Sequence, residues 1–144
     1  MADEQESLTP FPHAAQNRCF GCGADNPTGL RLEFLMAADR SVVCMTTVST
    51  AFEGPRGCLH GGVIATLLDE AMSKSVRALG VTAVTRHLEV DYLRPVPSGA
   101  PIRIEGHLVK SDGRKHETRA RILDGDRRIL ARSKGLFIEI QPQA

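Results

Sequence analysis

The segment from Cys58 to Ala71 brings together residue types that can cleave an acyl bond. His60, Gly61 and Gly62 stand at the predicted start of a helix, and Asp69 follows two turns further along. A helix start presents free backbone N–H groups and a partial positive charge, which suit a developing oxyanion. A carboxylate can act as a base or as a nucleophile. The segment therefore predicts a backbone N–H that polarises a carbonyl and a carboxylate that drives the attack on it.

The spacing of these groups constrains how they can be used. Gly61 and Asp69 are eight residues apart, which corresponds to about 12 Å of helical rise. Reacting groups must lie about 3 Å from the atoms on which they act. One carbonyl therefore cannot touch both groups of a single helix. Because only one long helix is predicted, the spacing indicates two subunits with the site repeated by a two-fold axis.

Helical periodicity distinguishes Asp69 from its neighbour Glu70. At about 100° per residue, Asp69 falls at the edge of an apolar arc, where partial burial would raise its pKa. Glu70 lies well inside the polar arc and can pair with Lys74. The apolar arc consists of Ile64, Leu67, Leu68, Ala71, Met72, Ala78 and Leu79. We assign the carboxylate chemistry to Asp69; the alternative is a solvated acidic residue without a role.

The composition argues against several classes of protein. The chain has 144 residues, a formal net charge of +1 and 4% aromatic residues. Neither electrostatic attraction to nucleic acid nor base stacking is therefore predicted. No apolar run reaches the length of a membrane span, and the acidic residues 1–7 do not resemble a secretory signal. We expect a cytoplasmic, single-domain protein without nucleic-acid or membrane partners.

Cys19 and Cys22 have the spacing of half a zinc site. The second half is missing from the sequence, because no other ligand pair lies nearby. The residues that could complete a set by folding are Cys44, Cys58, His13 and His60. The sequence therefore predicts no metal and reduced thiols in a turn, with a structural metal or a redox pair as the alternatives.

Alternating apolar residues and turn signals divide the chain into elements. Residues 1–18 are expected to form a flexible N-terminal arm, and residues 19–144 a single domain. The predicted elements are strands over residues 30–37 and 41–48, a helix from Gly61 to Leu79 with Gly80 as its C-cap, and strands over residues 84–92, 102–110, 116–123 and 128–140.

This order of elements predicts an α+β fold. One long helix must be buried against an antiparallel sheet that curves around it. A sheet with so little helix to cover it leaves an edge and a face that favour association. We therefore expect a homodimer or a homotetramer.

Three motifs carry a resemblance to a known family. They are residues 19–23 with residues 26–30, residues 57–71, and residues 92–95. On these motifs the chain resembles hotdog-fold acyl-CoA thioesterases of the PaaI-like type, in the 4-hydroxybenzoyl-CoA thioesterase superfamily. The resemblance covers residues 18–138. It implies a hotdog fold and hydrolysis of an acyl-CoA thioester, with coenzyme A as part of the substrate and no separate cofactor.

The resemblance also implies roles for individual residues. Asp69 matches the family's carboxylate, which activates water or attacks the thioester directly. Gly61 matches the glycine whose N–H polarises the thioester carbonyl, and Thr85 matches an assisting residue on the strand after the helix. The family builds each site at a dimer interface, in agreement with the spacing argument.

The loop before His60 departs from the family pattern. Phe52 stands where many relatives have His, and Glu53 stands where they have Gln. A Glu beside Asp69 would repel it and could keep one of the two protonated. His60 itself is expected either to cap the helix or to hold the Gly61 turn in place.

Further residues are candidates for substrate binding. Gly62 follows the polarising glycine, and three cations could meet the phosphates of coenzyme A or simply be solvated. These cations are Arg86, Arg94 and Lys134.

Two other functions compete with hydrolysis. A hotdog hydratase would require a different pairing of Asp and His, which the sequence does not contain. A non-catalytic protein that binds or senses acyl-CoA is the main alternative. Asp69 argues against it, since a pure binding site gains nothing from a partly buried carboxylate, whereas the substituted Phe52–Glu53 loop favours it.

Overall fold

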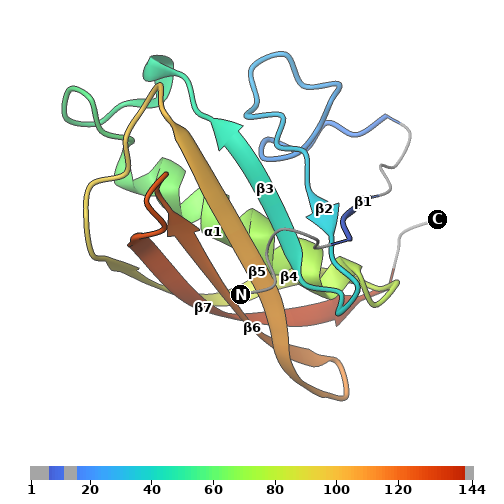
Figure 1. Ribbon diagram of the computed structural model, residues 1–144. Coiled ribbons are helices and arrows are strands. Elements are labelled where there is room, and N and C mark those ends of the chain that lie inside the picture. Colours follow the sequence, from blue (N-terminus) through green and yellow to red (C-terminus); the bar gives the residue numbers. More distant parts are fainter. Residues whose placement is uncertain (1–6, 12–15, 142–144) are drawn as a thin grey trace.

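The computed structural model of the chain describes residues 7–11 and 16–141, and these residues form one antiparallel sheet and one long helix (Figure 1). The sheet has the strand order β1-β2-β3-β5-β6-β7-β4. The helix α1 spans Gly61–Arg77, and a 3-10 helix spans Thr50–Phe52. The strands are β1 (Thr9–Pro10), β2 (Leu35–Met36), β3 (Val42–Thr47), β4 (Thr82–Tyr92), β5 (Pro101–Asp112), β6 (Lys115–Leu123) and β7 (Ile129–Ile140). The predicted α+β class is confirmed.

The sheet curves around α1, which crosses its inner face (Figure 1). One face of the helix is fully buried, as its apolar arc predicts. On the sheet side, buried residues alternate with exposed ones along β6, so the two faces of this strand meet core and solvent respectively. The buried helical residues are Ile64, Leu67, Leu68, Ala71, Met72, Ser75 and Val76.

Two glycines of the sheet allow the helix to approach closely. A Cβ atom at Gly106 of β5 would lie 2.5 Å from the backbone oxygen of Ala71. A Cβ atom at Gly135 of β7 would lie 2.9 Å from the Met72 side chain. Any side chain at Gly106 would therefore push the helix away from the sheet.

The helix ends earlier than predicted. Its last residue is Arg77 and its C-cap is Ala78, rather than Leu79 and Gly80. Gly80 still terminates the turn, because it adopts a positive φ of 84° and its N–H donates to the oxygen of Arg77 at 2.8 Å. The left-handed conformation that glycine tolerates thus lies three residues beyond the last residue of the helix.

The predicted strand over residues 30–37 is mostly wrong. Only Leu35–Met36 pairs as a strand, because the preceding backbone bonds to the turn that contains the first two cysteines. Leu30 N–H donates to the oxygen of Phe20 and Leu32 N–H to that of Gly21, at 2.8 and 2.9 Å. The five remaining predicted strands are confirmed to within two residues at each end.

Part of the predicted N-terminal arm packs on the domain. Thr9–Pro10 forms the edge strand β1, which pairs with β2. Phe11 is buried in the core, and its N–H donates to the oxygen of Phe34 at 3.1 Å. The expectation of a loose arm is therefore wrong for residues 9–11, whereas residues 1–6 and 12–15 lie outside the described residues.

We expect Gly106→Ala to destabilise the protein by about 1–3 kcal/mol, because the added methyl group must displace α1. The matched control is Gly125→Ala, in the hairpin between β6 and β7, where a Cβ atom meets nothing within 4 Å. Chemical denaturation of both variants measures the difference. Equal free energies of unfolding would show that the helix does not rest on this glycine.

Candidate active site

Asp69 lies half-buried on α1 and is held by a residue of β4. The Thr85 hydroxyl donates to Asp69 Oδ1 at 2.6 Å. Burial raises the pKa of Asp69 above its usual value, and the hydrogen bond from Thr85 offsets part of this rise. The predicted partial burial of Asp69 is present, and the structure adds a contact between Asp69 and Thr85, the residue that the resemblance names as an assisting one. A carboxylate with a raised pKa in a fixed orientation is suited to accept a proton.

The start of α1 is shaped by the residue that caps it. His60 Nδ1 accepts the Gly62 N–H at 2.9 Å, so His60 is the N-cap residue. Within residues 7–11 and 16–141, no group accepts the Gly61 N–H. This N–H is one of the free donors that a helix start presents, and it is available to a carbonyl oxygen. His60 therefore caps the helix and holds the Gly61 turn, as expected.

Gly62 does not offer a free polar group. Its N–H donates to His60, and its oxygen accepts the Thr66 hydroxyl at 3.0 Å. Any contact of Gly62 with substrate would therefore not use its N–H, and its role in substrate binding stays a prediction.

Tyr92 is a residue of this site that the sequence reasoning missed. Its hydroxyl donates to the oxygen of Gly61 at 2.9 Å, and its ring lies against the Gly61 backbone. Tyr92 and His60 thus hold the two ends of the Gly61–Gly62 peptide, which directly follows the peptide that carries the candidate Gly61 N–H. The signal was the motif of residues 92–95, which we used for family resemblance without assigning a role to the hydroxyl.

Strand β4 contacts both ends of the functional segment of α1. Thr85, near the beginning of β4, reaches Asp69, and Tyr92, its last residue, reaches Gly61. The strand is also the edge of the sheet next to β7. One strand therefore positions both Gly61 and Asp69, although they are eight positions apart on the helix.

Glu53 is engaged by its own loop and by the connection between β4 and β5. Its Oε2 accepts the Gly57 N–H at 3.1 Å and a short hydrogen bond from the Ser98 hydroxyl. Within one chain, burial and Thr85 are the causes of the Asp69 pKa shift, and Glu53 does not contribute. The predicted repulsion between Glu53 and Asp69 stays a prediction for a site that two subunits share.

The three predicted phosphate-binding cations lie apart from one another. Arg86 is exposed and sits in a β-bulge between Thr85 and His87. Arg94 Nη1 donates to the oxygen of Ile129 at 3.0 Å. Lys134 is exposed and lies on the outer face of the sheet, where it pairs in register with Arg119. Of the three, Arg86 is the nearest in sequence to Thr85, and it faces solvent.

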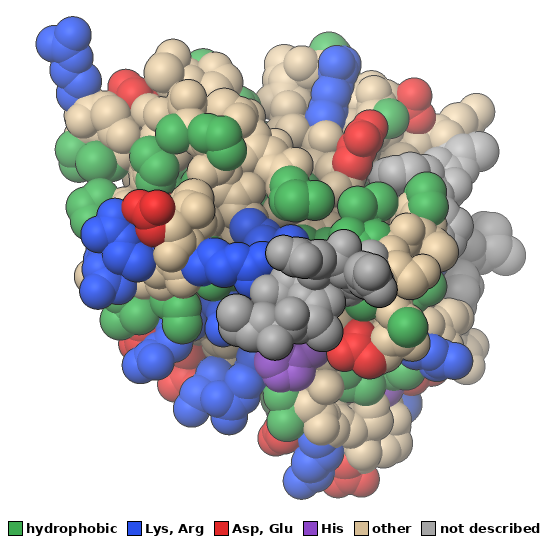
Figure 2. All heavy atoms as spheres, viewed as in Figure 1, with side chains coloured by type: hydrophobic (Ala, Val, Ile, Leu, Met, Phe, Trp, Pro, Cys, Tyr) green, Lys and Arg blue, Asp and Glu red, His purple; other side chains and the backbone are tan. Residues whose placement is uncertain are grey.

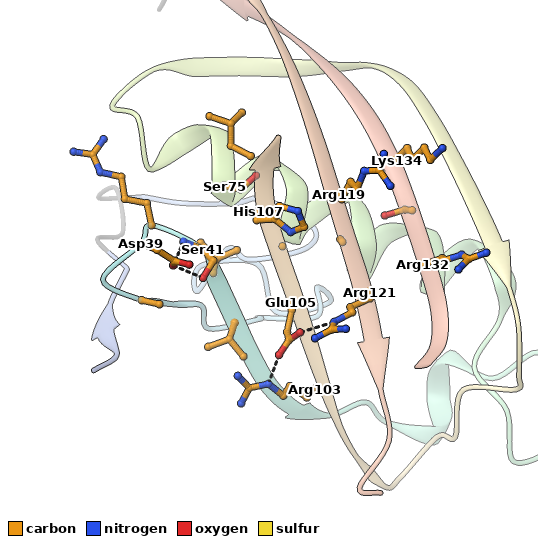
Figure 3. Close-up of a pocket in the computed structure, with 18 of the residues that line it drawn as sticks. Asp39, Ser41, Ser75, Arg103, Glu105, His107, Arg119, Arg121, Arg132 and Lys134 are labelled. Carbon is orange, nitrogen blue, oxygen red and sulfur yellow. Dashed lines mark hydrogen bonds and ion pairs between the residues drawn. The ribbon is translucent and has the colours of Figure 1, made fainter. Parts of the chain in front are cut away.

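A hollow of about 1110 Å³ is lined mainly by residues of β5, β6 and β7, with others from β3, β4 and α1 (Figure 3). Neither Asp69 nor Gly61 is among its lining residues. Glu105 bridges Arg103 and Arg121 there, at 2.7 and 2.6 Å. Burial alone would raise the pKa of Glu105, but the hydrogen bonds from the two arginines outweigh it and lower this pKa. Lys and Arg side chains gather on the face that Figure 2 shows. This hollow is thus a charged surface feature rather than the candidate active site.

Glu70 does not pair with Lys74 as predicted. Its Oε1 accepts the Cys19 thiol at 3.4 Å, whereas Lys74 Nζ donates to Cys22 Sγ at 3.0 Å and lies over the Phe11 ring. The N-terminal segment therefore contacts Glu70 and Lys74 of the predicted polar arc. Periodicity alone could not show this, because the contacting residues lie far away in the sequence.

The chain matches the Thioesterase superfamily over residues 56–131, which is more than half of its length. The match includes the His60 turn and Asp69. The chain belongs to this superfamily, and the family predicted from the motifs is confirmed.

Known relatives and solved structures agree with this assignment. The acyl-coenzyme A thioesterase THEM4 of Xenopus laevis is 34% identical over 118 residues, which cover 79% of this chain and 53% of that protein. The chain thus spans about half the length of the curated relatives it matches. A crystal structure of a thioesterase superfamily protein is 30% identical, with a TM-score of 0.80, and covers 85% of this chain and 63% of that one. The E. coli PaaI protein shares the hotdog fold at 19% identity, with a TM-score of 0.72 over 79% of this chain and 83% of that one.

Within the described residues, no helix combines the length and the apolar character that a membrane crossing requires. The cytoplasmic location stays a prediction.

We expect Asp69→Asn to stabilise the protein at pH 7 and to lose this advantage below about pH 4, near the unfolded-state pKa of Asp. Because burial raises the pKa of Asp69 in the folded state, the ionised carboxylate destabilises the folded protein relative to the neutral form. Asn keeps the volume and can still accept the Thr85 hydroxyl.

Thermal unfolding at pH 7 and pH 4 measures this effect. Asp126→Asn removes the same charge from an exposed hairpin and serves as the control. If Asp69→Asn is less stable than wild type at pH 7, the ionised Asp69 carboxylate does not destabilise the fold, and the raised pKa is contradicted.

Proposed function

We propose that the chain hydrolyses an acyl-CoA thioester to a free acid and coenzyme A. The observation that carries the proposal is the half-buried Asp69, held by Thr85, on a helix whose first N–H is free at Gly61. Membership of the thioesterase superfamily and the similarity to THEM4 support it. A hypothetical thioesterase of Streptococcus pneumoniae, 22% identical with a TM-score of 0.67 over 72% of this chain and 81% of that one, has been solved with coenzyme A.

The residues divide the reaction between them. The Gly61 N–H donates to the thioester carbonyl oxygen and stabilises the negative charge that develops there. Asp69 takes a proton from the attacking water, or attacks the carbonyl itself to form an anhydride that water then opens. The C–S bond breaks, and the coenzyme A sulfur leaves as a thiolate that takes up a proton. Thr85 is a positioning residue, since it acts through the Asp69 carboxylate.

The proposal requires a second copy of the chain. The two groups are separated by about 12 Å of helix, so the Gly61 of one subunit must face the Asp69 of another. The edge strand β4 supports such an assembly, because it is eleven residues long and exposes Val84 and Tyr92 at 48% and 54%. A long exposed edge of this kind is a template for pairing with another strand. We propose a dimer, or a tetramer built from two dimers.

A non-catalytic acyl-CoA-binding protein is the second candidate. The observation that favours it is the loop of Phe52 and Glu53, where the Glu53 carboxylate bonds to Gly57 and Ser98 instead of standing free. A Glu53 carboxylate that is already hydrogen-bonded in this way is less available to contact a reacting substrate. In this case Gly61 would hold the carbonyl without hydrolysis following.

Release of thiol from a panel of acyl-CoAs distinguishes the two candidates. We expect wild type to release thiol and Asp69→Asn to lose about 10²–10⁴-fold in kcat, as is typical when a general base is removed. The rate of wild type should fall toward acid with a midpoint above the usual range for Asp, because the Asp69 pKa is raised.

The control is again Asp126→Asn, which should keep the wild-type rate. A wild type that binds acyl-CoA but releases no thiol would establish the binding protein. A variant at position 69 that keeps more than about a tenth of kcat would remove Asp69 from the role of base.

A further inference from the structure

Three possible metal ligands meet where the N-terminal segment crosses α1. They are Cys19 and Cys22, which begin and end a four-residue segment of one turn, and Glu70, which follows Asp69 on the helix. The two sulfur atoms and a carboxylate oxygen all lie within 4.8 Å of one another. Cys19 Sγ and Glu70 Oε1 are 3.4 Å apart. The half-site that the sequence left incomplete therefore gains its third ligand from the helix.

These separations fit a tetrahedral zinc ion. With Zn–S of about 2.3 Å and Zn–O of about 2.1 Å, tetrahedral geometry places a sulfur and an oxygen ligand about 3.6 Å apart. By the same bond lengths, two sulfur ligands lie about 3.8 Å apart. The distance of 3.4 Å between Cys19 Sγ and Glu70 Oε1 is close to the expected sulfur–oxygen separation. The two sulfur atoms lie within 4.8 Å of each other, which is compatible with the expected sulfur–sulfur separation.

The turn is built so that these groups can approach. Gly23 N–H donates to the oxygen of Cys19 at 2.8 Å and closes the turn. A Cβ atom at Gly23 would lie 2.4 Å from the Cys19 nitrogen, so only glycine fits there. A Cβ atom at Gly21 would lie 2.3 Å from Glu70 Cγ. The absence of a side chain at Gly21 is what lets the Glu70 side chain reach the cysteines.

The surroundings of Cys22 suit a metal-bound thiolate. Its sulfur is buried and accepts from Lys74 Nζ at 3.0 Å and from Asn17 Nδ2 at 3.6 Å. Donors to the ligand atoms orient a site and balance its charge. Two thiolates and a carboxylate give a divalent ion a net charge of −1, which the Lys74 ammonium neutralises.

We propose that Cys19, Cys22 and Glu70 bind a structural Zn²⁺ ion, with Lys74 as the charged donor to Cys22 and water as the fourth ligand. Binding forms two Zn–S bonds and one Zn–O bond, and the two thiol protons pass to solvent without electron transfer. Thiolate ligands select zinc over magnesium or calcium. The ion would join the turn of residues 19–23 to α1 one residue after Asp69, and so hold the N-terminal segment on the domain.

The test uses the untagged full chain, reduced with a phosphine that does not bind metal. Because each chain has one set of ligands, we expect elemental analysis after dialysis to find about one zinc ion per chain. Titration of the metal-free protein with Co²⁺ should give a sulfur-to-cobalt charge-transfer band. Cys19→Ser and Cys22→Ser should lose this band, whereas Cys58→Ser, which alters a half-buried cysteine of another loop, should keep it.

Two further variants address the helix. Glu70→Gln should weaken zinc binding in a chelator competition by at least about tenfold, and Lys74→Met by about 10–100-fold, as is usual for groups that support a ligand. Tighter binding by Lys74→Met would show that the ammonium occupies the position assigned to the ion, and would overturn the proposal.

Other results would also overturn it. Wild type without bound zinc and without a charge-transfer band would exclude the site, and this measurement does not depend on whether any variant folds. A band that survives in Cys19→Ser would place the metal elsewhere. A freshly purified chain without metal, in which the peptide of residues 19–31 has a mass lower by two hydrogens, would identify Cys19 and Cys22 as a disulfide pair instead.

Discussion

In the reaction we propose, the distance between two groups on one helix constrains how the chain can be used. Gly61 presents a free N–H at the start of α1, and Asp69 presents a carboxylate two turns further along. The rise between them, about 12 Å, exceeds what a single carbonyl group can span. In the reaction we propose, a chain that carries both groups therefore carries two half-sites, and a complete site would require two chains. The edge strand β4, which contacts both groups, is the element best placed to bring the second chain.

The rest of the fold keeps these half-sites rigid. Gly106 lets α1 rest directly on the sheet, so that the buried face of the helix fixes its rotation. That rotation leaves Asp69 half-buried, which raises its pKa, and aligns it with Thr85. His60 and Tyr92 then hold the N–H and the C=O of the Gly61–Gly62 peptide, next to the candidate Gly61 N–H. Packing, rather than any single strong interaction, positions the chemistry.

The local features of the site could be predicted from the sequence, and the contacts between distant segments could not. The His60 turn, the apolar arc and the position of Asp69 follow from helical periodicity, which is a local property. Thr85 was found only through the family resemblance. The segment of residues 30–34 alternates like a strand, yet its N–H groups bond to Phe20 and Gly21. The turn that contains Phe20 and Gly21 also places Cys19 against Glu70 of the helix. A contact between segments so far apart in the sequence cannot be predicted from a local pattern.

A mixed dimer tests the shared site most directly. Gly61→Pro removes the candidate N–H at the first helical position, where proline is tolerated, and Asp69→Asn removes the carboxylate. Each variant alone should be inactive. Co-expressed with different tags and purified as heterodimers, they contain one intact site in two, and we expect about half of the wild-type activity per dimer. Proven heterodimers without activity, or a fully active monomer, would contradict the account.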